Sequence, residues 1–252
     1  MLAAAAAGHA AAAQLVIVID DLGYSLERAE RVMTLPAPVT LGLLPFAPKT
    51  PAIALRALET GHEMILHQPM ESLPAPHARP VAGTLTSTMS ASRFTELLDA
   101  SLRAVPGIIG VNNHTGSRLT QDPTAMRRLM HQLSGRRLIF LDSRTTADTV
   151  AYRMAQEAQV PALQRDVFLD HVPHPRAIDR AFQDAVALAR QRGRAIVIGH
   201  PYPVTLDYLE RALADLDADV TVTSLQALVS RDGPATLVRQ ENPEPPRRSL
   251  GQ

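Results

Sequence analysis

The feature that most constrains the fold of this 252-residue sequence is an alternation of short apolar runs with amphipathic segments. The apolar runs are rich in Val, Ile and Leu, which is typical of strands buried on both faces of a parallel sheet. The segments between them begin at capping residues such as Ser25 and Ser90, which indicates helices. The predicted strands are residues 15–19, 39–44, 63–67, 107–112, 138–142, 162–166, 195–199 and 220–223.

This alternation predicts the class of fold. Strands and helices that alternate along a whole chain form parallel sheets with right-handed crossovers. Seven or eight such units that close on themselves give a (β/α) barrel, and a doubly wound open sheet is the alternative. We therefore expect an α/β protein, with one barrel domain of seven to eight mostly parallel strands over residues 15–230. In both folds the functional site lies at the carboxyl ends of the strands.

The two ends of the sequence differ from this middle part. Residues 1–14 are almost all Ala and are too short and too weakly apolar to span a bilayer. They are either the remnant of a signal peptide or a leader without a targeting signal. The first alternative implies a periplasmic or secreted protein, and the second implies a cytoplasmic one. Residues 231–252 are rich in Pro and poor in apolar residues, which predicts a disordered tail.

Composition narrows the chemistry. The absence of Cys excludes zinc fingers, disulfide scaffolds, cysteine nucleophiles and iron–sulfur clusters, so the nine His and the carboxylates must hold any metal. The 25 Lys and Arg residues balance the 25 Asp and Glu residues, so the formal net charge is zero. The lack of surplus positive charge argues against nucleic acid as a partner.

Polar side chains follow nearly every predicted strand. Each one alone is more often a helix cap or a turn former than a functional residue. Together they reach one rim of a parallel sheet, where converging imidazoles and carboxylates are costly to bury unless a cation compensates them. The residues at these strand ends are Asp20, Asp21, His67, Asn112, Asn113, His114, Asp142, Asp166, Asp170, His171 and His200.

The adjacent acids Asp20 and Asp21 suggest hydrolysis. Because the chain turns at the strand end, one carboxylate can bind a metal while its neighbour acts as a base toward water. His200, on another strand, would then protonate the leaving group. Acids and imidazoles gathered on one rim suit a neutral sugar better than a polyanion.

Six segments in this order resemble the NodB-like deacetylases of carbohydrate esterase family 4. The resemblance is closest to their divergent polysaccharide deacetylase branch, the YibQ-like proteins of the bacterial envelope, and runs from Leu15 to Val229. The segments are residues 16–24, 61–71, 110–117, 140–146, 165–171 and 196–203.

The resemblance implies a distorted (β/α) barrel with a Zn²⁺ ion or another divalent transition metal. It implies that Asp20 is the catalytic base, that Asp21 and His67 are metal ligands, and that His200 is the general acid. The position of the family's second ligating His holds Glu71, and we expect His114 to supply the missing imidazole. Glu71 and His171 are the reserve ligands, and Asp142 and Asp166 are expected to orient the ligands through hydrogen bonds.

The sequence departs from the family in two further respects. The Arg-rich third motif has no clear match, and the tryptophan motif is missing because the chain has no Trp. Three functions therefore remain open. The first is a metal-dependent hydrolase that deacetylates an N-acetylated envelope carbohydrate. The second is a catalytically inactive protein that binds a glycan or an envelope protein partner. The third is a cytoplasmic small-molecule hydrolase on the same fold.

Overall fold

A computed structural model describes residues 12–74 and 81–230 of the chain. Residues 1–11 of the expected leader and all of the expected tail lie outside the described residues. Ala13 and Gln14, which the sequence assigned to the leader, are the first residues of strand β1 (Ala13–Leu22).

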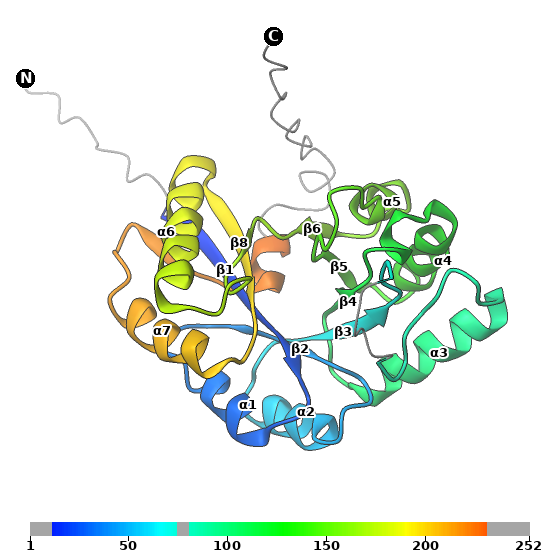
Figure 1. Cartoon of the computed structure of the whole chain (residues 1–252), viewed down its shortest axis with the longest axis horizontal. Helices are drawn as coiled ribbons and strands as arrows, with labels where there is room; N and C mark the ends of the chain where they lie inside the picture. The colour runs from blue at the N-terminus through cyan, green and yellow to red at the C-terminus, as the bar shows by residue number, and fades with distance from the viewer. Residues whose placement is uncertain (1–11, 75–80, 231–252) are drawn as a thin grey trace, which may run out of the picture.

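The strands form one parallel sheet that curls into a half-barrel, with the helices on its outside (Figure 1). The strand order is β6-β5-β4-β3-β2-β1-β8-β7, and β9 pairs with the start of β1. After β1 the strands are β2 (Thr40–Leu43), β3 (Met64–Met70), β4 (Gly110–Thr115), β5 (Ile139–Asp142), β6 (Ala162–Gln164), β7 (Val167–Phe168), β8 (Arg194–Gly199) and β9 (Val220–Val222).

Helices occupy most of the connections between the strands. Among the described residues, no helix is both long enough and apolar enough to cross a membrane. The helices are α1 (Leu26–Met33), α2 (Thr50–Glu59), α3 (Ala91–Ala104), α4 (Pro123–Ser134), α5 (Ala151–Glu157), α6 (Pro175–Arg192) and α7 (Pro203–Ala214), with a 3-10 turn η1 (Leu119–Gln121) before α4.

The predicted distorted (β/α) barrel is confirmed, but some strands differ from their predictions. β1 and β3 run on to Leu22 and Met70, so Asp20, Asp21 and His67 lie within strands and not after them. The segment expected as a single strand over residues 162–166 is two strands, β6 and β7, at opposite ends of the strand order. The Arg165 amide donates to Asp142 O at the end of β5, whereas the Asp166 amide donates to Ile196 O of β8. The chain thus crosses between the two ends of the sheet within two residues, which a propensity pattern does not reveal.

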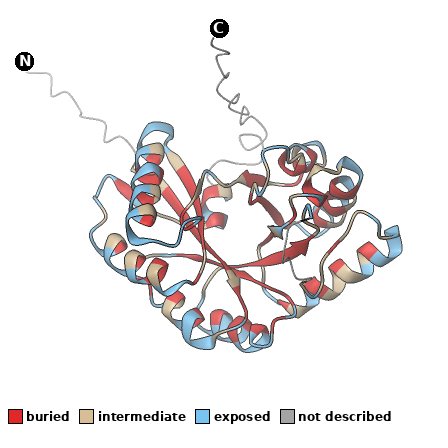
Figure 2. Ribbon diagram, viewed as in Figure 1, coloured by how far each residue is buried: buried red, intermediate tan, exposed pale blue. Residues whose placement is uncertain are grey.

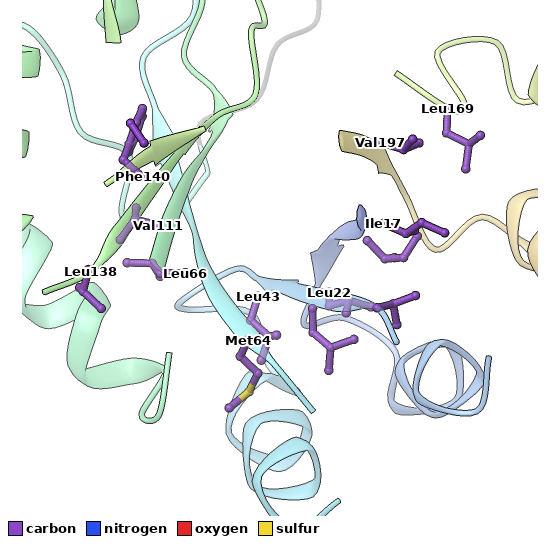
Figure 3. Close-up of a cluster of buried hydrophobic side chains, with 14 of the residues drawn as sticks. Ile17, Leu22, Leu43, Met64, Leu66, Val111, Leu138, Phe140, Leu169 and Val197 are labelled. Carbon is purple, nitrogen blue, oxygen red and sulfur yellow. The ribbon is translucent and has the colours of Figure 1, made fainter. Parts of the chain in front are cut away.

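Two apolar layers hold the sheet, as expected when side chains alternate between the faces of a strand. Ile17 and Leu66 point outward into the larger layer, which packs the strands against the helices (Figure 3). Val16, Val18 and Leu141 point inward into a smaller cluster inside the half-barrel. Burial accordingly follows the strands and the inner faces of the helices (Figure 2).

A short helix at residues 225–230 closes the interior of the half-barrel. Leu225 and Leu228 of this helix belong to the inner cluster. The carboxylate of Glu63 caps it by accepting the Leu225 and Gln226 amides at 2.8 and 2.9 Å. Glu63 precedes β3, so this plug lies at the amino ends of the strands and leaves the carboxyl ends for the polar rim.

Candidate metal centre

The carboxyl-terminal parts of β1, β3 and β4 bring three predicted ligands together. Asp21 Oδ1 lies 2.8 Å from His114 Nδ1 and 3.2 Å from His67 Nε2. The two imidazole nitrogens are 3.1 Å apart. The parallel register of β3 and β4 pairs Pro69 with His114, two residues beyond His67, so both rings reach the same rim. Asp21 turns toward them because it adopts a left-handed backbone conformation with φ 60°.

This triangle of atoms fits a transition-metal site. Asp21 Oδ1 is buried and accepts no hydrogen bond of good geometry, although two imidazole nitrogens lie within 3.2 Å. Ligand atoms of a tetrahedral zinc ion with bonds of about 2.0–2.1 Å are about 3.3 Å apart, close to the separations found here. Two imidazoles and a carboxylate are also the usual protein ligands of catalytic zinc and of non-haem iron.

The electrostatics of the site favour a cation. Burial alone would lower the pKa of His67, but the charges of Asp20 and Asp21 outweigh it and raise this pKa to about 9. Burial would raise the pKa of Asp21, but its contacts with His114 and His67 hold this pKa far below the ordinary range. The site thus stabilises positive charge between two carboxylates, as a bound cation requires.

Asn112 connects His67 to Asp20. Its Nδ2 donates to both oxygens of Asp20, at 3.0 and 2.8 Å, so its Oδ1 faces His67 Nδ1 at 2.9 Å. An amide oxygen only accepts hydrogen bonds, so this pattern assigns the proton of neutral His67 to Nδ1. The lone pair is then on Nε2, the atom that faces Asp21 and His114, as a metal ligand requires.

Asp20 is a buried carboxylate beside the ligands, with a side chain that is 2% exposed. Burial raises its pKa, and the charges of His67 and His200 oppose that rise only in part. A raised pKa makes a carboxylate a more effective proton acceptor near neutral pH. Gly42 of β2 makes room for this carboxylate, because a Cβ at residue 42 would collide with Asp20 Oδ1.

His200 lies on the other side of Asp21, with its Nε2 3.8 Å from Asp21 Oδ2. Its Nδ1 contacts Asp170 Oδ1 at 2.9 Å, and Asp170 Oδ2 accepts both the His200 amide and the Thr205 hydroxyl. Burial lowers the pKa of His200, but the hydrogen bond and charge of Asp170 raise it overall. This Asp–His pair keeps a proton available on a ring that faces the candidate metal centre.

Aromatic rings fix the plane of His200. Phe168 and Tyr202 flank it, with ring centroids 5.3 and 5.5 Å away. Arg165 lies over Phe168 at 4.9 Å from the ring centroid, and its guanidinium donates to Ser143 O and Arg144 O. The loop after β5 is thus tied to His200 across the point where the sheet is open.

The remaining predicted site residues lie outside the cluster. The Glu71 carboxylate accepts hydrogen bonds from the amide and hydroxyl of Ser87 and lies 3.7 Å from Arg118. It therefore stabilises the loop that contains Ser87. His171 is exposed on the loop after β7. Asp142 accepts the Arg144 amide and the Thr149 hydroxyl, and Asp166 accepts the Ile196 amide. The hydrogen bonds that orient His67 and His200 come instead from Asn112 and Asp170.

Asn112 and Asp170 were not expected from the sequence to orient a ligand. Both stand at predicted strand ends, so position alone could have drawn attention to them. A lone Asp or Asn after a strand is usually a turn former, however, and only the hydrogen bonds distinguish these two.

The half-barrel and its Asp–Asp–His–His rim define a NodB-like barrel protein. A family described as divergent polysaccharide deacetylase matches residues 17–229, and the chain belongs to this family. It is 34% identical over 239 residues to the uncharacterized protein YibQ of Escherichia coli (strain K12), with 94% of this chain and 74% of that protein covered.

Solved structures share this fold. An uncharacterized protein from Agrobacterium tumefaciens superposes with a TM-score of 0.81 at 25% identity, over 88% of this chain and 91% of that one. A carbohydrate esterase family 4 pseudoenzyme from Bacillus anthracis has a TM-score of 0.53 at 13% identity, over 86% of this chain and 65% of that one. The second likeness concerns the fold alone.

Proposed function

We propose that this protein is a metal-dependent hydrolase that removes acetyl groups from an N-acetylated envelope carbohydrate. One observation carries the proposal. The three predicted ligands have the buried carboxylate of Asp20 on one side. On the other side they have His200, whose imidazole contacts the Asp170 carboxylate. Amide hydrolysis needs a base that takes a proton from water and an acid that gives one to the departing amine.

Asp21, His67 and His114 would hold the cation, which is Zn²⁺ or another divalent transition metal. When bound, such an ion supplies Lewis acidity, which acidifies water and polarises a carbonyl group. The Asn112 hydrogen bond holds one proton of His67 on Nδ1, so Nε2 is the nitrogen that would give up its proton to a bound cation.

The proton transfers belong to two side chains. Asp20 accepts the proton of the attacking water, since its carboxylate is held by Asn112 and its pKa is raised by burial. His200 donates a proton from Nε2 to the amine, because Asp170 occupies its Nδ1. Hydrolysis of the C–N bond then releases acetate and leaves a free amino group on the sugar.

The test measures acetate release from chitooligosaccharides and peptidoglycan fragments after the apo protein is loaded with Zn²⁺. We expect release that falls by about 10²–10⁴-fold in Asp20→Asn, since a general base contributes this much. The variant keeps the three proposed ligands, so its zinc affinity should stay close to that of the parent protein. Release no greater than in the Asp20→Asn variant contradicts the proposed activity.

A catalytically inactive glycan- or partner-binding protein is the second candidate. Glu71 binds Ser87 in place of a ligating imidazole, and the chain has no Trp. This candidate predicts that glycan binding persists by calorimetry while acetate release stays at the background level with every metal tried.

We also propose that the protein works in the periplasm or outside the cell, where an envelope carbohydrate is accessible. N-terminal sequencing of the protein from its native host tests this proposal. A mature chain that begins near the end of the Ala-rich segment supports export. An intact Ala-rich segment on a cytoplasmic protein favours the small-molecule hydrolase instead.

A further inference from the structure

A pocket of about 170 Å³ adjoins the candidate metal centre. One wall is the end of β1 with the loop after it, from Asp21 to Ser25, together with Arg28 of α1. The other wall is the loop after β8, from His200 to Tyr202. Because Asp21 and His200 belong to both the pocket and the rim, a group bound here lies directly beside the group that reacts.

The pocket exposes two aromatic rings. Tyr24 is 62% exposed and Tyr202 is 39% exposed, whereas most large apolar side chains of the described residues are buried. Exposed aromatic surface at a concave site is typical of a surface that a ligand covers. Flat rings that carry a polar hydroxyl suit a ligand with an apolar face and a polar edge, such as a pyranose.

The pocket also contains an unpaired cation. Arg28 is exposed, and no ion pair between the described residues involves its guanidinium. Arg31, one turn further along α1, is instead held by Asp207 and Glu210. The Arg28 amide donates to Ser25 Oγ, which fixes the start of α1 and so the base of this side chain. A free guanidinium favours a carboxylate, which it can bind through two parallel hydrogen bonds.

We propose that this pocket holds the sugar next to the reacting one and that Arg28 binds a carboxylate on that sugar. The proposal rests on the proposed function and narrows its substrate class. The preferred glycan alternates N-acetylated sugars with sugars that bear an acidic substituent. This refines the sequence-based expectation of a neutral sugar, because Arg28 supplies one local positive charge in a rim of acids.

The test compares two oligomers with the same β-1,4 backbone. Chitooligosaccharides are neutral, and peptide-free oligomers of N-acetylglucosamine and N-acetylmuramic acid carry a lactyl carboxylate on alternate residues. We expect the zinc-loaded protein to favour the acidic oligomer in kcat/KM. Arg28→Gln should reduce the acidic-to-neutral ratio about tenfold or more, mainly through KM, as the loss of one charge-assisted pair predicts. Arg28→Lys should restore part of the ratio.

The matched control is Arg103→Gln, which removes an exposed arginine from α3 and should leave the ratio unchanged. Binding of both oligomers to the Asp20→Asn protein, measured by calorimetry, separates this proposal from the proposed function. Acidic-oligomer binding that depends on Arg28 supports the pocket even if no acetate is ever released. An unchanged ratio in Arg28→Gln, or equal losses for both oligomers, overturns the proposed carboxylate recognition by Arg28. Acetate release from either oligomer would still support the proposed function.

Discussion

At the scale of single residues, the candidate site depends on the neighbours of its reactive groups. Asp20 and Asp21 are adjacent, yet one is a buried acceptor of amide hydrogen bonds and the other faces two imidazoles. The left-handed backbone of Asp21 separates their directions. Asn112 then occupies Nδ1 of His67 and leaves Nε2 to face Asp21 and His114. Environment, rather than residue type, therefore gives these side chains different roles.

Gly42→Ala should impair catalysis without removing a ligand. The added methyl group collides with the Asp20 carboxylate, so Asp20 must leave its place beside Asn112. We expect the rate of acetate release to fall by about 10²–10⁴-fold, which is the usual rate contribution of a general base. The loss of zinc affinity should be smaller. Gly135→Ala is the control, because a Cβ there contacts nothing within 4 Å. Equal activity in the two variants would contradict the role of Gly42.

Zinc affinity should rise as the pH increases toward 9. In the metal-free protein the pKa of His67 is about 9, so His67 is protonated at pH 7 and must lose its proton to bind a metal. Below the pKa, protons compete with zinc, and above it the competition ends. Calorimetry in buffers of different ionisation enthalpy should detect about one proton released per zinc at pH 7. No proton release at this pH would contradict the assignment of His67 as a ligand.

At the scale of elements, the crossing between β6 and β7 joins the two sides of the site. Arg165 binds carbonyl oxygens of the β5 loop and stacks on Phe168, which packs against His200. The three proposed ligands belong to β1, β3 and β4, and His200 follows β8, the strand that pairs with β1. The pairing of β1 with β8 thus places His200 beside Asp21, and the crossing supports the His200 ring through Phe168.

Arg165→Gln should affect the position of His200 more than metal binding. We expect a loss of about 1–3 kcal/mol in the free energy of unfolding, because hydrogen bonds from a charged, half-buried group disappear. The kcat for acetate release should fall while zinc affinity changes little. Urea denaturation and a chelator competition assay measure the two effects, and the exposed Arg180→Gln on α6 is the control. A loss of zinc affinity as large as the loss of kcat would show that Arg165 supports the whole fold instead.

At the scale of the whole molecule, the half-barrel has two unlike ends. The helix at residues 225–230 fills the amino end with apolar side chains, and the carboxyl end carries the acids and imidazoles. Stability and chemistry are therefore separated along the strand direction, as in other parallel barrels. Substitutions at the plug should change stability and leave the chemistry of the folded protein intact.

Glu63→Gln tests this separation. The carboxylate caps the plug helix through two backbone amides, and an uncharged amide side chain caps less well. We expect a loss of about 1–2 kcal/mol in unfolding free energy, measured by urea denaturation, with kcat per folded molecule unchanged. Glu59→Gln, at an exposed ion pair with Arg56, should cost less. A large loss of kcat at full folding would contradict the separation.

Local sequence patterns were enough to predict the fold class and the rim at which acids and imidazoles meet. Apolar runs predicted the strands, and parallel strands share one carboxyl edge, so Asp21, His67 and His114 were expected on one rim. Residue type and position also pointed to His200. The fold class is confirmed, and Asp21, His67 and His114 do lie together, because both inferences depend on local patterns and on a general property of parallel sheets. Their chemical roles stay predictions.

Only the tertiary structure decided the connections. The split of residues 162–166 into β6 and β7, the contact of Glu71 with Ser87, and the pairing of His200 with Asp170 each depend on atoms far apart in the sequence. A hydrogen bond requires a direction and a distance of about 3 Å, and strand order and side-chain rotamers set both. Local propensity carries no information about either, because the residues that meet at this rim are separated by whole helices.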